Sequence, residues 1–220
     1  MTSSSVVRFV ALAALWFYAP AQAQWLSTAG VKAGINSSNS AIEQTSIGYQ
    51  FETQRRIGWQ AAIFAEWLKL PVVSVVTQVE YARRGFAEEQ VRTGIESPEP
   101  LGTFQLQTRL DYVSIPVLLK LQPSNSGVKP YALLGPRFDF LVNHETALYE
   151  DGKLDLEFSL AEAFNDRAVG ATVGLGVVAK ALSLPLLLEA RYNFDFDDVA
   201  DAELLTVKNN SVDLWLGIMF

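Results

Sequence analysis

The segment Leu110–Val142, LDYVSIPVLLKLQPSNSGVKPYALLGPRFDFLV, contains two long stretches of alternating residues separated by a short segment of Pro, Ser, Asn and Gly. Apolar side chains occupy the odd positions from 113 to 121 in the first stretch and the even positions from 132 to 142 in the second. This period of two predicts two β-strands joined by a turn. Lys120, Arg137 and Asp139 lie on the opposite faces. One apolar face and one charged face is typical of a strand between lipid and a polar interior.

The same alternation recurs along the chain and predicts eight strands, at about residues 29–36, 56–68, 73–86, 104–121, 131–142, 168–181, 186–196 and 211–220. The connections between them alternate long and short, and the long ones are polar. Short turns at one end and long loops at the other are typical of outer-membrane barrels. The sequence therefore predicts an all-β fold: an eight-stranded antiparallel up-and-down transmembrane β-barrel with short periplasmic turns and long extracellular loops, in the bacterial outer membrane.

The N-terminal residues have the features of a secretory signal peptide. Arg8 is followed by an apolar run over residues 9–19 and by Ala21-Gln22-Ala23. The run is shorter than the roughly 20 residues that a membrane helix needs, and Ala-x-Ala is the pattern of a peptidase site. We expect cleavage after Ala23, which divides the chain into a signal peptide, residues 1–23, and a barrel domain, residues 24–220.

Composition excludes several classes of protein. Removal of Arg8 with the signal peptide changes the formal charge from -7 to -8, and this acidic balance argues against a nucleic-acid partner. The chain has no Cys, so a disulfide scaffold and a thiol nucleophile are excluded. A hydrophobic content of 50% excludes disorder.

The fourth predicted strand changes phase. Phe104, Leu106 and Leu110 place apolar side chains on even positions, whereas the apolar residues from Val113 onward are on odd positions. A slip of one residue inverts every side chain, so the pattern predicts a β-bulge near Asp111 to Val113.

Two other folds would fit parts of the pattern. A soluble barrel of the lipocalin type would turn the apolar face inward around a ligand. Residues 168–190 carry only two charges in 23 residues, a content that is compatible with a membrane helix. Three glycines at period two and Pro185 argue against the helix. The polar face carries five cations and five anions, and such a balance suits an interior where each charge needs a partner. We predict an interior polar network of Glu66, Glu80, Lys120, Arg137, Asp139, Lys180, Glu189, Arg191 and Asp213, with Lys32 on the same face.

Three stretches resemble the PorT-like family of outer-membrane β-barrel proteins. They are Glu80-Tyr81 with Gly85, the strand LDYVSIPVLLK at residues 110–120, and KPYALLGP at residues 129–136. The resemblance implies an eight-stranded barrel and, through the named member of the family, a link to protein secretion or envelope assembly. It implies no functional residues here.

The last strand ends with Phe220, preceded by apolar residues at alternate positions. It resembles the strand that the barrel assembly machinery of the outer membrane recognises. We therefore expect this machinery and outer-membrane lipid as partners, together with an unidentified protein partner.

Catalytic and metal-binding residues are scarce. The single histidine, His144, precedes Glu145, and Ser159 and Glu150 lie nearby, which would suit an outer-leaflet lipid hydrolase, but the spacing matches no catalytic motif. Weak Ca²⁺ candidates in the last long loop are Asp195, Asp197, Asp198 and Asp201. Ala200 stands where an EF-hand loop has Gly. The sequence predicts no catalytic residues and no cofactor.

An eight-stranded barrel is just wide enough to be filled by its own side chains. The sequence therefore predicts a non-enzymatic barrel with a structural or interaction role. The alternatives are a lipid-modifying enzyme of the outer leaflet and a barrel that binds or transports a small molecule.

Overall fold

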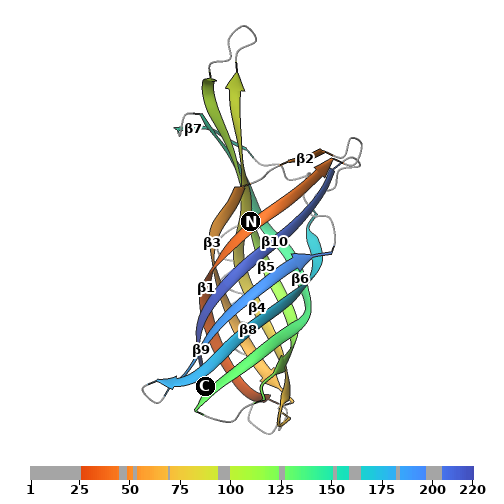
Figure 1. The fold of residues 1–220 in the computed structure, drawn as a ribbon, viewed down its shortest axis with the longest axis vertical. Coiled ribbons are helices and arrows are strands. Elements are labelled where there is room, and N and C mark those ends of the chain that lie inside the picture. Colours follow the sequence, from red (N-terminus) through yellow and green to blue (C-terminus); the bar gives the residue numbers. More distant parts are fainter. Residues whose placement is uncertain are drawn as a thin grey trace.

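The computed structural model describes residues 26–44, 49–51, 54–68, 70–93, 100–123, 127–150, 153–158, 165–181, 184–196 and 205–220. Eight strands form a closed antiparallel barrel (Figure 1). They are β1 (Leu26–Gln44), β3 (Gln54–Trp67), β4 (Val73–Thr93), β5 (Pro100–Leu121), β6 (Val128–Glu150), β8 (Arg167–Ala181), β9 (Leu184–Asp195) and β10 (Leu205–Met219). Each pairs with the next, and pairing of β10 with β1 closes the wall. The predicted fold class is confirmed.

Two short strands lie outside the wall: β2 (Tyr49–Phe51), which pairs with β1, and β7 (Lys153–Phe158), which pairs with β6. The predicted signal peptide, residues 1–23, lies outside the described residues. In the described part of the chain, no helix has the length and apolarity that crossing a membrane requires.

The two faces of the wall differ as the alternation predicted. Leu175 and Leu216 are 69% and 62% exposed on the outside, whereas Arg137 and Glu189 are 2% and 4% exposed inside. In a membrane the outer face contacts lipid, so exposed apolar side chains there are stabilised by hydrocarbon instead of destabilised by water. The charged side chains point into the barrel.

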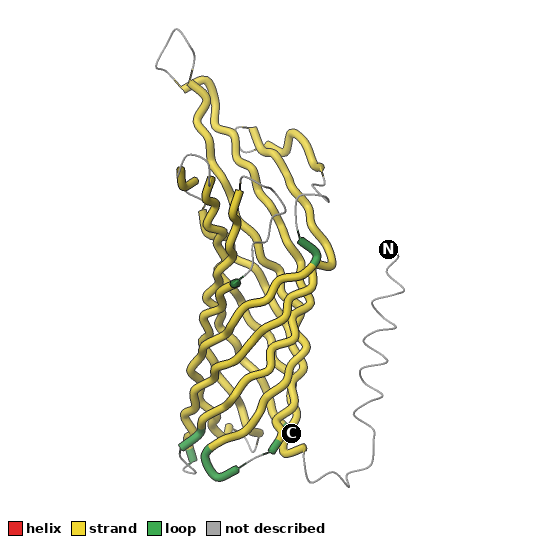
Figure 2. Tube along the Cα trace, turned by 90° about the vertical axis from the view of Figure 1, so that its right-hand side faces the viewer, coloured by secondary structure: helices red, strands yellow, loops and turns green. Residues whose placement is uncertain are grey.

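The strands are longer than predicted. β1 continues to Gln44, β4 and β5 form a hairpin that extends to Thr93 and Pro100, and β6 continues to Glu150 before pairing with β7. Three of the four predicted outer loops, at 37–54, 87–103 and 143–166, are therefore partly strands, which project beyond the barrel (Figures 1 and 2). They were missed because a strand with water on both faces has no apolar alternation.

The predicted bulge is present, but in the neighbouring strand. Asp111 of β5 pairs with Asn143 and Tyr112 pairs with Leu141, so the extra residue is Val142 of β6. The predicted inversion of β5 is therefore wrong: Leu110 is 1% exposed and faces the interior, like the other even residues of β5.

The interior is not polar throughout. Near the short turns, inward-facing side chains form an apolar cluster of Phe64, Val76, Leu118, Tyr131, Leu133, Val178, Leu187 and Met219. These residues come from every wall strand except β1, and their burial inside the barrel closes its periplasmic end.

Candidate functional site

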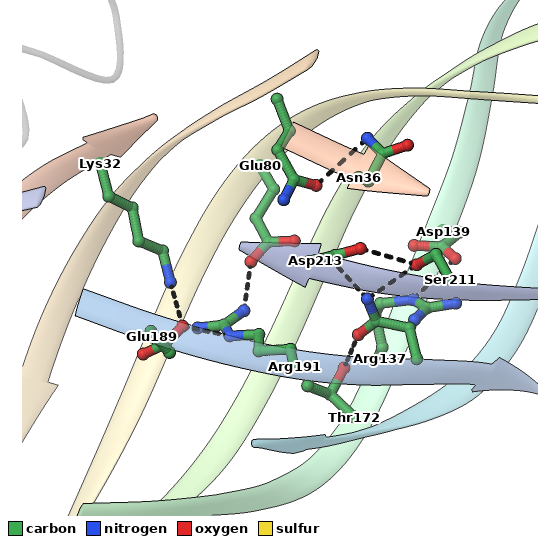
Figure 3. Close-up of polar contacts among 12 residues, drawn as sticks. Lys32, Asn36, Glu80, Arg137, Asp139, Thr172, Glu189, Arg191, Ser211 and Asp213 are labelled. Atoms are coloured by element: carbon green, nitrogen blue, oxygen red, sulfur yellow. Dashed lines mark hydrogen bonds and ion pairs between the residues drawn. The ribbon is translucent and has the colours of Figure 1, made fainter. Parts of the chain in front are cut away.

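The lumen above this apolar cluster is crossed by ion pairs between strands that are distant in the sequence. Lys32 Nζ on β1 lies 3.0 Å from Glu189 Oε1 on β9. Arg191 contacts the same carboxylate and also donates to Glu80 Oε1 on β4, at 2.7 Å. Tyr131 on β6 donates to the other oxygen of Glu189 at 2.8 Å. One carboxylate therefore joins β1, β6 and β9. Figure 3 shows its contacts with Lys32 and Arg191.

A second ion pair lies closer to the periplasmic turns. Lys120 Nζ on β5 is 2.8 Å from Glu66 Oε2 on β3, and Ser74 on β4 donates to the other oxygen of Glu66 at 2.8 Å. Lys120 Nζ also lies 4.7 Å from the centre of the Tyr131 ring. The phenol ring of Tyr131 thus connects this pair with the Glu189 cluster.

A third group of charges lies in the outer half of the barrel. Arg84 Nη1 is 2.8 Å from Asp139 Oδ2, and Arg137 Nε is 2.8 Å from the same oxygen. Arg137 also contacts Asp195 through its second nitrogen. All four side chains are at most 3% exposed. Two guanidinium groups and two carboxylates therefore balance one another within β4, β6 and β9.

Asp213 on β10 is held by neutral groups. Its carboxylate accepts hydrogen bonds from Asn193 Nδ2 at 2.6 Å and Ser211 Oγ at 2.8 Å, and Thr172 Oγ1 donates to the amide oxygen of Asn193 at 2.7 Å (Figure 3). Hydrogen bonds to a carboxylate stabilise its charge without a cation. These hydrogen bonds link β8, β9 and β10, between the Glu189 cluster and the Arg137 cluster.

The lumen is narrow. A cavity of about 20 Å³ lies between the apolar cluster and the Lys32, Glu66 and Glu189 pairs, which is room for about one water molecule. A buried charge without a partner destabilises the folded state by several kcal/mol. Charged side chains in such a narrow space are therefore stable only when each has an opposite charge beside it. The arrangement is that of a packed interior.

The structure brings eight of the nine predicted network residues into the barrel, and the exception is Lys180. It is exposed next to the turn between β8 and β9, opposite Pro185, where the inner face opens to solvent. Arg84 and Asp195 belong to the ionic clusters and were not included in the predicted network. Their positions on the polar faces of β4 and β9 were the signal that would have identified them.

The other candidate sites are not assembled by the described residues. Asp195 contacts Arg137, whereas Asp197, Asp198 and Asp201 lie outside the described residues. Within the described ranges, no group of three or more His, Asp or Glu could hold a metal ion. His144 lies on β6 opposite Leu110, Glu145 pairs with Arg109, and Ser159 is not described.

The closed barrel, its apolar outer face and its charged lumen define a bacterial outer-membrane β-barrel protein. The sequence matches the family model of the outer membrane protein beta-barrel domain over residues 21–201. The chain belongs to this family. A comparison with characterised proteins gave no match.

Several solved outer-membrane proteins have similar folds. Ail of Yersinia pestis, solved with the heparin analogue sucrose octasulfate, is 14% identical, with a TM-score of 0.42 and coverage of 88% of this chain and 98% of Ail. OprG of Pseudomonas aeruginosa is 13% identical, with a TM-score of 0.44 and coverage of 89% and 97%. The protease OmpT of Escherichia coli is 7% identical, with a TM-score of 0.45 and coverage of 90% and 97%.

Proposed function

We propose that this protein is a non-enzymatic barrel that anchors an extracellular interaction surface in the outer membrane. The observation that carries the proposal is the contrast between its two parts. The lumen is occupied by ion pairs and by an apolar cluster, with a cavity of about 20 Å³. The wall strands, in contrast, continue past the barrel as paired strands.

The extension offers backbone hydrogen-bonding groups to a partner. β3 pairs with β4 only as far as Ala87, so in the described part of the chain the rest of β4, up to Thr93, pairs with β5 alone. Similarly, β7 pairs only with β6 among the described strands. An unpaired strand edge binds an extended segment of another protein by adding a strand to the sheet. These two edges support an interaction role.

The resemblance to the PorT-like family leads to a narrower version of this role, in protein secretion or envelope assembly. The residues that carry it, 110–120 and 129–136, lie in β5 and β6, which also form the base of the extension. In this proposal the partner is an unidentified envelope or secreted protein. The assembly machinery acts on the strand that ends at Phe220 during insertion.

The proposal is tested by three measurements on the wild-type protein and a deletion strain. We expect no sustained ion current in planar bilayers, unchanged phospholipid and lipid A profiles, and an altered set of secreted or surface proteins. An ordered current would instead indicate a channel, and changed acylation of the lipids would indicate an enzyme.

The interaction surface is located by crosslinking in intact cells. A photoreactive residue at Leu156, which is exposed on β7, should give one discrete protein adduct. The same residue at Leu175, which is exposed on the lipid-facing wall, is the matched control and should give none. Equal protein adducts at both positions, or none at Leu156, would contradict the interaction role.

A further inference from the structure

A second cavity lies at the outer end of the barrel wall, away from the lumen clusters. It has a volume of about 210 Å³ and is bordered by β3, β5 and β6. Its lining consists of Arg56, Gln107, Arg109, Glu145, Ala147 and Tyr149. Five of these six side chains are polar and two of them are arginines, so we refer to this cavity as the arginine cleft. Neither the fold nor the lumen network requires it.

Arg109 is fixed in the cleft by two carboxylates. Its Nη1 lies 2.7 Å from Glu145 Oε2 and its Nη2 lies 3.4 Å from Asp111 Oδ2. Asp111 is held in turn by Arg83 at 3.1 Å and by Asn143 at 3.2 Å. The Nε–H of Arg109 is buried without a hydrogen-bond partner among the described residues. A preorganised guanidinium with an unused donor is suited to binding an oxygen of an anion.

Arg56 supplies a positive charge that no carboxylate among the described residues pairs with. Its side chain is half-buried and makes no ion pair or hydrogen bond with other described residues. β4 lies between β3, which carries Arg56, and β5, which carries Arg109. The β4 residue that pairs with Arg109 is Gly85, which has no side chain to separate the two arginines. Their like charges repel across the cleft. A bound anion would remove this repulsion.

Among the side chains that the structure describes around the cleft, positive charges outnumber negative ones. Arg56, Arg83 and Arg109 face two carboxylates, those of Asp111 and Glu145, so one positive charge remains within this set. The chain as a whole carries a formal charge of -7. A local positive charge on an acidic protein selects an anionic ligand at short range, where screening is weakest.

The height of the cleft relative to the membrane indicates the source of the anion. Trp59 is 48% exposed on the outer face of β3, its ring lies 5.1 Å from that of Tyr81, and Arg83 lies 5.5 Å from the Trp59 ring centre. Exposed tryptophan and tyrosine mark the level of lipid head groups. Arg56 precedes Trp59 by three residues on β3 and lies roughly 10 Å farther along the strand toward its extracellular end. The cleft thus lies at the height of the outer head groups.

We propose that the arginine cleft binds a phosphate group of an outer-leaflet glycolipid. Arg56 provides the uncompensated charge, and Arg109 provides the buried Nε–H donor. Gln107 and Tyr149 line the remaining wall, where their polar groups can contact the sugar that carries the phosphate. Basic pockets at membrane surfaces bind lipid head groups through the same combination of charge and hydrogen bonding. The inference is independent of the proposed partner role of the extension.

The test measures binding of purified, folded protein in detergent micelles to two lipid probes by native mass spectrometry. The probes are lipid A with both phosphates and lipid A from which both were removed, and inorganic phosphate is added as a competitor. We expect the phosphorylated lipid to bind about tenfold or more tightly than the other, as for the loss of a hydrogen bond to a charged group. Inorganic phosphate should compete only weakly.

Arg56→Gln should abolish the preference for the phosphorylated lipid. Arg55→Gln is the matched control, because it removes the same charge at the adjacent residue. Arg55 donates hydrogen bonds to Ser37 and Asn210 and does not line the cleft. It should retain the preference within about twofold. Equal effects of the two variants, or equal binding of both lipids by the wild type, would overturn the assignment. Complete competition by inorganic phosphate at equal concentration would show a free-anion site and overturn it as well.

Discussion

Lys32 and Glu189 are separated by 157 positions in the sequence, yet their side chains meet inside the barrel at 3.0 Å. The contact exists because β10 pairs with β1 and β9 pairs with β10, which brings the first wall strand next to the last two. Closure of the barrel and pairing of these charges are therefore coupled. A barrel that does not close leaves Lys32 without this partner.

Lys32→Leu should lower the free energy of unfolding by about 3 kcal/mol, the lower end of the range for breaking a buried pair. The lower end applies because Arg191 and Tyr131 still contact Glu189. Equilibrium unfolding in urea, followed by the heat-modifiable shift in gel migration, measures the change. Lys180→Leu is the same substitution at an exposed site and should change stability by no more than about 0.5 kcal/mol. Equal effects would show that Lys32 is not part of a stabilising network.

Arg137→Leu should destabilise the barrel by about 3–5 kcal/mol without opening a channel. The substitution removes the cation between Asp139 and Asp195, so stability falls. Conductance should stay at the wild-type level because the apolar cluster still closes the periplasmic end. Single-channel recording of both proteins in planar bilayers is the measurement. A new current in the variant would show that Arg137 is a gate instead of a structural ion.

The alternation of residues was sufficient to predict the wall, because its cause is local. Apolar side chains at every second position in β8 and β10 must face one side, and their lack of charge identifies that side as the lipid face. The same rule predicted that Glu66, Lys120 and Arg137 lie inside. Alternation does not show how deep in the barrel a residue lies. Lys180 is on the polar face of β8, as predicted, but it lies near the end of the strand and is exposed.

The choice of ionic partners was not predictable, because it depends on strand register and tilt. Arg137 contacts Asp195 across 58 positions, which no pattern within either strand indicates. The bulge shows the same limit. A phase change between Leu110 and Val113 indicates an irregularity, but it does not show which of two paired strands carries the extra residue. The arginine cleft joins three strands, so its lining was also outside the reach of sequence patterns.

Leu175→Arg should destabilise the barrel by about 2–4 kcal/mol, because a charge near the centre of β8 on the lipid face must enter hydrocarbon. Leu184→Arg is the matched control at the periplasmic end of β9, where the side chain is 54% exposed near the turn. Charges near the interface cost about 0–1 kcal/mol. Unfolding in lipid bilayers with increasing urea compares the two. If both variants lose stability equally, the outer face does not contact hydrocarbon in the way inferred.

Gly176→Ala should destabilise the barrel by about 1–3 kcal/mol through overpacking. Gly176 pairs with Tyr131 on one side and Glu189 on the other, and a Cβ at this position would overlap the Tyr131 ring. Moving the ring would break the hydrogen bond from Tyr131 to Glu189. The double variant with Tyr131→Ala separates the two effects, because alanine at 131 provides space for the added methyl group. In that background Gly176→Ala should be nearly neutral in urea unfolding, whereas an undiminished loss would mean that backbone conformation at 176, and not the ring, requires glycine.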